Sequence, residues 1–193
     1  MRTMMLPLVL IVSSATWALA QDEDERNSAA QGGNLVENPS FEKGDTLPDA
    51  WSRYALIYRE DIFIWSTESK MGRRSVEVSV PPDQLNDARW VQWVSVVPNS
   101  EYRLSGWIKT QGVQHSPQVV QAGANLSIYD GVIKFVYTPP LFGDNDWTRV
   151  EVEFNTGPET ELIVAARVGE FSGMTTGTAW FDGVRLQRIG PRH

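Results

Sequence analysis

Residues 92–110 read QWVSVVPNSEYRLSGWIKT, two runs of alternating apolar and polar residues that a proline and an asparagine separate. A period of two is the repeat of a β-strand, in which successive side chains point to opposite faces of a sheet. In the second run, Tyr102, Leu104 and Ile108 fall on one face, which is the apolar one. We therefore predict two β-strands here, each with one face on a hydrophobic core.

The same pattern recurs along the chain from Asn34 onward, in short runs rich in Val, Ile, Thr and aromatic residues. The clearest predicted strands are residues 75–80, 89–97, 102–110, 124–129, 148–155, 162–168 and 178–187, with shorter ones at 35–41, 51–58 and 62–66. No window shows the i, i+3, i+4, i+7 apolar spacing of a helix of normal length. Many closely spaced strands predict an all-β fold, a two-sheet β-sandwich or jelly roll.

The first 33 residues differ in composition from the rest. Residues 1–20 combine an early arginine, an apolar stretch and a small-residue cleavage pattern, which is typical of a secretory signal peptide. Residues 21–33 are charged, small and glycine-ended, which indicates a disordered acidic tether. We expect a secreted protein, extracellular or periplasmic, whose folded domain spans residues 34–193.

Composition excludes several kinds of site. The chain has no cysteine and only two histidines, His115 and His193, so thiolate metal sites, cysteine nucleophiles and multi-histidine metal centres are excluded. Calcium needs only oxygen ligands and is compatible with this composition. The formal net charge of −7 argues against nucleic acid and an anionic membrane as partners, because both require a basic surface. A neutral ligand is expected.

Aromatic side chains lie on the polar faces of two predicted strands. Trp107 shares its face with Arg103, and Tyr129 shares its face with Asn125. Sugar rings have apolar faces and hydroxyl edges, so an aromatic platform flanked by polar side chains is typical of a glycan site. These four residues are candidate polysaccharide ligands.

A third aromatic comes from residues 89–97. Trp90 and Trp93 lie on opposite faces of this strand, so at most one of them joins the same surface. With the following valines in the core, Trp93 points outward, and Trp90 is a second choice that a bulge at the start of the strand would expose. We interpret the outward aromatics of these three strands as one binding face. The alternative for each is packing beneath a loop or a terminal segment.

An acidic residue interrupts the apolar face of the last predicted strand. Asp182 alternates there with apolar residues, which predicts that its carboxylate points into the core. A buried carboxylate is costly unless it has a cation or hydrogen-bond donors. Two solutions stay open. One is calcium shared with Glu42, which pairing of the terminal segments would bring nearby; the other is a salt bridge or backbone hydrogen bonds, for instance from Arg73 or Arg74.

Several segments together resemble a known family. In chain order they are NLVENPSFEKG (34–44), GRRSVEV (72–78), QWVSVVPNSEYRLSGWIKT (92–110), DWTRVEVEF (146–154) and GTAWFDGVRL (177–186). Their order is similar to that in jelly-roll carbohydrate-binding modules attached to bacterial xylanases and endoglucanases, which have a galactose-binding-like β-sandwich. The resemblance implies a non-catalytic module that binds β-glucan or xylan chains on an aromatic-lined sheet face. It also implies a structural calcium ion, with Glu42 and Asp182 among its surroundings.

Two other functions stay open. Glu151 and Glu153 share a strand face at a spacing near the ~5–5.5 Å of retaining glycosidases, which motivates a glycoside hydrolase. Alternating charges are, however, more typical of a solvated strand face. The third hypothesis is an extracellular protein-binding adaptor that uses the same aromatic surface. A grooved aromatic row favours glycan chains, whereas a flat apolar patch favours a protein partner.

Overall fold

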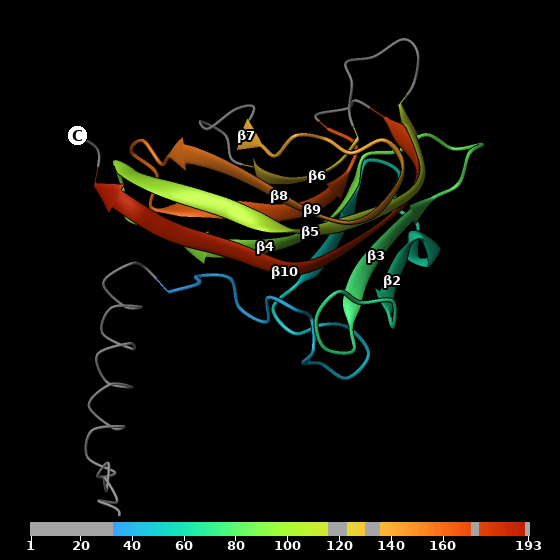
Figure 1. Cartoon of the computed structure of the whole chain (residues 1–193), viewed down its shortest axis with the longest axis horizontal. Helices are drawn as coiled ribbons and strands as arrows, with labels where there is room; N and C mark the ends of the chain where they lie inside the picture. Colours follow the sequence, from blue (N-terminus) through green and yellow to red (C-terminus); the bar gives the residue numbers. More distant parts are fainter. Residues whose placement is uncertain (1–32, 116–122, 130–135, 171–173, 192–193) are drawn as a thin grey trace, which may run out of the picture.

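Two antiparallel sheets of five strands each form the protein, as the computed structural model in Figure 1 shows. The structure describes residues 33–115, 123–129, 136–170 and 174–191. The strand order is β1-β4-β9-β6-β7 in the first sheet and β2-β3-β10-β5-β8 in the second. The strands are β1 (Ser52–Ala55), β2 (Phe63–Ser66), β3 (Ser75–Val80), β4 (Ala88–Ser95), β5 (Ser100–His115), β6 (Ala124–Tyr129), β7 (Val136–Tyr137), β8 (Gly143–Asn155), β9 (Glu161–Val168) and β10 (Thr175–Pro191). The predicted all-β, two-sheet jelly-roll sandwich is confirmed.

Helical structure is limited, within the described residues, to one short 3-10 helix, η1 (Glu60–Ile62). No helix in that part of the chain is long and apolar enough to cross a membrane. The predicted signal peptide, residues 1–20, and the predicted tether, residues 21–33, lie outside the described residues except for Gly33.

The predicted strands are present with one exception, and the long strands β5 and β10 extend beyond their predicted ends. These two strands pair along their length and lie side by side across the molecule in Figure 1. Residues 35–41 are not a strand, because Asn38 and Phe41 have positive φ angles of 47° and 58°, outside the β region. The segment still follows β10, since the Leu35 N–H donates to the Leu186 carbonyl at 2.9 Å.

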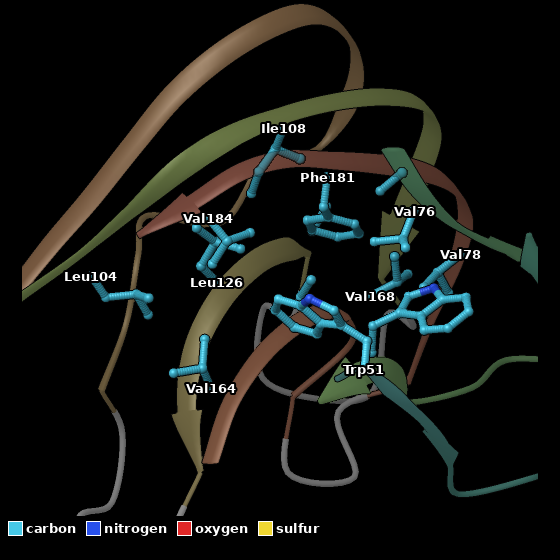
Figure 2. Close-up of a cluster of buried hydrophobic side chains, with 14 of the residues drawn as sticks. Trp51, Val76, Val78, Leu104, Ile108, Leu126, Val164, Val168, Phe181 and Val184 are labelled. Atoms are coloured by element: carbon cyan, nitrogen blue, oxygen red, sulfur yellow. The ribbon is translucent and has the colours of Figure 1, made fainter. Parts of the chain in front are cut away.

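The hydrophobic core lies between the inner faces of the two sheets (Figure 2). Its members include Val76, Val78, Leu104, Ile108, Phe181 and Val184 from the second sheet, Leu126, Val164 and Val168 from the first, and Trp51. Trp90 crosses this core, because its indole N–H donates to the Glu77 carbonyl of the opposite sheet at 3.1 Å. Gly106 permits a close approach of the sheets, since a Cβ there would lie 2.8 Å from a methyl carbon of Leu126.

A β-bulge interrupts β10 next to Asp182. Asp182 pairs with Trp107 and Arg185 pairs with Ser105, so β10 has one extra residue in this interval. Gly183 has a φ of 59°, as bulge residues in the left-handed region do. The extra residue reverses the alternation, which places Asp182 on the outer face of the second sheet. The prediction that Asp182 points into the core is therefore wrong.

The bulge glycine gives a first test. Gly183→Ala places a side chain in the left-handed region, which costs about 1–2 kcal/mol for an L-residue, and its Cβ would lie 2.9 Å from Met71 Sδ. We expect the free energy of unfolding in urea to fall by about that amount. Gly190→Ala, in the same strand but with nothing within 4 Å of the new Cβ, is the control. Equal losses for both variants would contradict a special role for Gly183.

Candidate functional site

The first sheet has an outer face, turned away from the core, that carries buried polar side chains. On β4, β9 and β6, Arg89, Arg167 and Asn125 lie opposite one another in register. Their exposed fractions are 4%, 0% and 0%. We call this surface the first-sheet outer face, and its described residues are Ser52, Tyr54, Arg89, Val91, Trp93, Ser95, Asn125, Ser127, Tyr137, Glu161, Ile163, Ala165 and Arg167.

Small and large side chains form separate rows across this face. The register aligns Val91, Ala165 and Ser127 as a row of small residues across three strands. On one side of this row lie the arginines of β4 and β9, and on the other side Trp93 lies opposite Ile163. All three side chains of this row are buried, with Ala165 and Ser127 at 0% and Val91 at 5% exposure.

Two polar atoms of this face are buried without a hydrogen-bond partner among the described residues, namely Asn125 Oδ1 and Ser127 Oγ. The Asn125 amide is oriented by its Nδ2, which donates to the carbonyls of Gly123 and Gly169, each at 3.1 Å. An unsatisfied buried polar atom costs about 1–3 kcal/mol. Hydroxyl groups of a bound ligand would supply the missing partners.

An ionic network closes one end of the face. The Arg89 Nη1 donates to Asp87 Oδ1 at 3.1 Å, while Arg167 donates from Nε to the same oxygen at 2.7 Å and from Nη2 to Oδ2 at 2.5 Å. The ring of Tyr54 lies 4.3 Å from the Arg89 guanidinium and is 52% exposed. These contacts fix both arginines and hold an exposed aromatic ring beside them.

Glu170 adds a second buried acid to this network. It is 7% exposed, and its Oε2 has no hydrogen-bond partner among the described residues. Burial raises the pKa of Glu170, the positive charge of Arg167 opposes the rise, and the negative charge of Asp87 adds to it. Glu170 Oε2 is thus a further acceptor without a donor at this end of the sheet.

The residues predicted to bind a ligand fall in three places. Trp93, which is 56% exposed, and Asn125 lie on the first-sheet outer face. Trp107 and Arg103 lie on β5, on the outer face of the second sheet and hence on the opposite side of the sandwich. Trp90 is in the core with 0% exposure. The prediction of one face that combines these side chains is therefore wrong.

Tyr129 is the last of the predicted ligands. Its backbone lies in β6, in register with Ile163 of the first sheet. Its side chain lies outside the part of the chain that the structure describes. The register places the residue on the first-sheet outer face, and its role there stays a prediction.

The second-sheet outer face is occupied by charge pairs. Lys70 Nζ lies 4.6 Å from the ring centroid of the half-buried Trp107. Arg103 Nη2 lies 2.6 Å from Glu153 Oε1, and Arg149 Nη2 lies 3.2 Å from Glu151 Oε2. The two glutamates considered for hydrolysis are thus exposed and paired with arginines, as on a solvated strand face.

Sequence reasoning missed Tyr54, Arg89, Ser127 and Arg167. One signal was present, because Arg167 interrupts the apolar run LIVAARV of β9. An arginine within such a run indicates a buried cation with a partner. That partner, Asp87, comes from the residues before β4 and becomes evident only when the strand register is known.

Glu42 and Asp182 both bind the backbone of the loop at residues 70–74. Asp182 Oδ2 accepts from the Lys70 N–H at 2.8 Å and the Met71 N–H at 2.7 Å. Glu42 Oε1 accepts from the Arg73 N–H at 2.7 Å and the Arg74 N–H at 2.8 Å. The loop therefore covers Asp182, which is 0% exposed although it lies on an outer face.

These carboxylates are the residues to test against a calcium ion. Asp182 Oδ1 is buried without a hydrogen-bond partner among the described residues. Burial raises the pKa of Asp182, and the N–H groups of Met71 and Lys70 oppose the rise. No cluster of three or more His, Cys, Asp or Glu is present in the described part of the chain. A calcium ion at this pair would need further oxygen ligands such as backbone carbonyls, because Ca²⁺ takes about six to eight oxygens.

Comparison with known proteins adds sequence and structure relatives. No protein-family profile matches the chain. Exochitinase 1 from Streptomyces olivaceoviridis is 26% identical over 185 residues, which are 96% of this chain and 26% of that protein. The chain thus spans about a quarter of the length of this relative.

Solved structures of carbohydrate-binding modules share the fold. A family 61 module in complex with β-1,4-galactotriose superposes with a TM-score of 0.53 at 19% identity, over 80% of this chain and 98% of the module. The CBM22-1 xylan-binding domain of Paenibacillus barcinonensis Xyn10C superposes with a TM-score of 0.50 at 16% identity, over 83% of this chain and 97% of the domain. The chain therefore has the jelly-roll fold of carbohydrate-binding modules, as the sequence resemblance implied.

Glu170 gives a test of the buried network. Its raised pKa means that the protonated form contributes stability below the pKa of the unfolded chain and that this contribution is lost as pH rises through the folded-state pKa. Glu170→Gln keeps a neutral group there, so we expect its Tm to exceed that of the wild type at neutral pH and to converge with it in acid. Thermal unfolding across pH measures this. The exposed Glu161→Gln is the control, and a pH-independent difference for Glu170→Gln would contradict the interpretation.

Proposed function

We propose that the protein is a secreted, non-catalytic module that binds neutral polysaccharide chains of the β-glucan or xylan type on the first-sheet outer face. One observation carries this proposal. Asn125 Oδ1 and Ser127 Oγ are buried on a face that is not the core and have no partner within the described residues. A sandwich selected for stability alone would place apolar side chains at these positions, because unsatisfied polar atoms are destabilising.

The aromatic rings of the face complete the chemistry of a glycan site. Tyr54 and Trp93 are 52% and 56% exposed. They flank the row formed by Val91, Ala165 and Ser127, and their faces would stack on the apolar faces of sugar rings. The unpartnered oxygens would accept or donate hydrogen bonds to hydroxyl groups at the edges of the same rings.

The relatives support the ligand class. The superposed modules bear names that mention β-1,4-galactotriose and xylan, and the sequence relative is named an exochitinase. A binding panel for this protein therefore includes xylan, β-glucan, β-1,4-galactan and chitin. The ion pairs of Glu151 and Glu153 with neighbouring arginines support binding rather than hydrolysis.

A specific observation favours a second candidate, the extracellular protein-binding adaptor. Tyr54, Leu56, Ile57 and Tyr58 form a nearly continuous run of exposed apolar side chains, at 52%, 54%, 40% and 55% exposure. Asn86 holds this run in place, because its Oδ1 accepts from the Ile57 N–H at 3.1 Å and its Nδ2 donates to the Ile57 carbonyl at 2.7 Å. A fixed apolar patch of this kind is a feature of protein interaction surfaces.

Ser127 provides the sharpest test of the glycan proposal. Ser127→Ala removes an atom without a partner, so we expect unchanged or higher stability. Affinity for the recognised polysaccharide should fall about two- to tenfold, the equivalent of one neutral hydrogen bond. Affinity electrophoresis measures binding and urea unfolding measures stability. Unchanged affinity in a folded variant would contradict the assignment of this face.

Tryptophan variants distinguish the two outer faces. Trp93→Ala should weaken glycan binding by about five- to 150-fold, because a stacking platform contributes on the order of 1–3 kcal/mol when buried by a ligand. Trp107→Ala, on the opposite face, is the matched control. Isothermal titration with a soluble oligosaccharide compares them. A loss for Trp107→Ala alone would place the site on the second sheet instead.

Calcium in a structural role is part of the proposal, with Glu42 and Asp182 as the residues that would hold it. Calcium at one hundred times its Kd stabilises a folded protein by about 2.7 kcal/mol. We therefore expect EDTA to lower the Tm and calcium to restore it, and Asp182→Asn to abolish the response. A Tm that EDTA leaves unchanged would count against the ion.

A further inference from the structure

A pocket of about 480 Å³ lies beside Trp93, along the edge of β4. It is lined by Leu35, Glu37, Ala50, Gln92, Trp93, Val94 and Ser95. β1 pairs with β4 only as far as Ser52 and Val91, so this edge of β4 faces the N-terminal segment instead of a strand. The volume lies within the range of about 300–1,000 Å³ that small-molecule sites occupy.

Gln92 builds this pocket. Its side chain is 4% exposed and bonds the backbone of Glu37 twice, because Oε1 accepts from the Glu37 N–H at 2.8 Å and Nε2 donates to the Glu37 carbonyl at 3.0 Å. The two bonds resemble those between the backbones of paired strands, but here one partner is the glutamine side chain, so the two backbones lie farther apart. The N-terminal segment is thereby fixed at a distance from β4, and the space between them is the pocket.

The charges at this pocket are acidic. Glu37 is the one charged residue among those that line it. Glu161 lies opposite Ser95 in the register and, two positions from Ile163, on the same outer face as Trp93. Both carboxylates are exposed, and neither has an ion-pair partner among the described residues. Glu151 and Glu153, on the opposite face of the sandwich, pair with arginines instead.

We propose that this pocket binds a protonated amino-sugar residue of a polysaccharide chain. An exposed tryptophan ring attracts an ammonium group through the negative face of its π system. The carboxylate of Glu37, which lines the same pocket, and that of Glu161, which follows from the register as a neighbour of this site, add Coulomb attraction for the same charge. A neutral sugar would gain only the stacking contact with Trp93, so the acidic groups favour the cationic ring. The inference rests on the proposed function in taking the ligand to be a glycan, and it differs from it in that the preferred chain carries positively charged rings instead of neutral ones.

Three β-1,4-linked hexasaccharides that differ at one position of each ring test the proposal. They are the hexamers of glucose, N-acetylglucosamine and glucosamine, which carry a hydroxyl, an acetamide and an ammonium group at C2. Titration calorimetry at about pH 5.5 keeps an ordinary amine protonated and an ordinary glutamate ionised. At low salt we expect the glucosamine hexamer to bind about five- to tenfold more tightly than the other two, from one cation–π contact and two surface charge pairs.

Variants assign the preference to the pocket. The double variant Glu37→Gln/Glu161→Gln should remove the preference, so that the glucosamine and glucose hexamers bind with about equal affinity. Glu151→Gln/Glu153→Gln changes the net charge equally on the opposite face and should keep the preference. About 1 M salt, where the screening length is about 3 Å, should also reduce it.

The outcomes separate this inference from the proposed function. Equal or weaker binding of the glucosamine hexamer, or a preference that survives Glu37→Gln/Glu161→Gln, would overturn the inference, and a Ser127-dependent affinity for the glucose hexamer would still support the proposed function. A Glu37-dependent preference that Ser127→Ala leaves intact would support the pocket and argue against the proposed face. Binding of none of the three hexamers would overturn the inference.

Discussion

Four backbone hydrogen bonds to two carboxylates join the N-terminal segment, the loop at residues 70–74 and the middle of β10. Glu42, from the N-terminal segment, and Asp182, from β10, each accept two N–H groups from the loop at residues 70–74. Charge-assisted bonds of this kind are stronger than neutral ones. Because the loop is fixed, Asp182 is removed from water and Lys70 is placed over Trp107. Three segments far apart in the sequence thus depend on the same two anions.

β5, β6 and β10 show what the alternation of side chains can predict and where it fails. Tyr102, Leu104 and Ile108 are buried as the period of two predicts, and so are the inward residues of β6. Asp182 fails because one extra residue at Gly183 reverses the faces of β10. A glycine within a strand is the sequence signal of such a bulge. The glycine shows where the alternation of inward and outward side chains can change. Only the register with β5 shows that Asp182 lies on the outer face.

The candidate binding face was harder to predict from the sequence than the fold. Alternation assigns each side chain to the inside or the outside of its own sheet, but it does not say to which sheet a strand belongs. β4 and β5 follow each other in the chain and nevertheless lie in different sheets. Trp93 and Trp107 are therefore both outward, as predicted, yet lie on opposite sides of the sandwich. Strand order depends on long-range pairing, which no local pattern contains.

The buried polar groups of this sandwich are of two kinds, those with hydrogen-bond partners in the described residues and those without. Asp182 Oδ2, Gln92 and Asn86 obtain their partners from the chain itself, and each fixes a loop or a terminal segment. Asn125 Oδ1, Ser127 Oγ and Glu170 Oε2 obtain none within the described residues. All three lie on or beside the first-sheet outer face, close to the two arginines that pair with Asp87. Folding gains no hydrogen bond from these atoms, and under the proposed function the hydroxyl groups of a bound glycan would supply the missing partners.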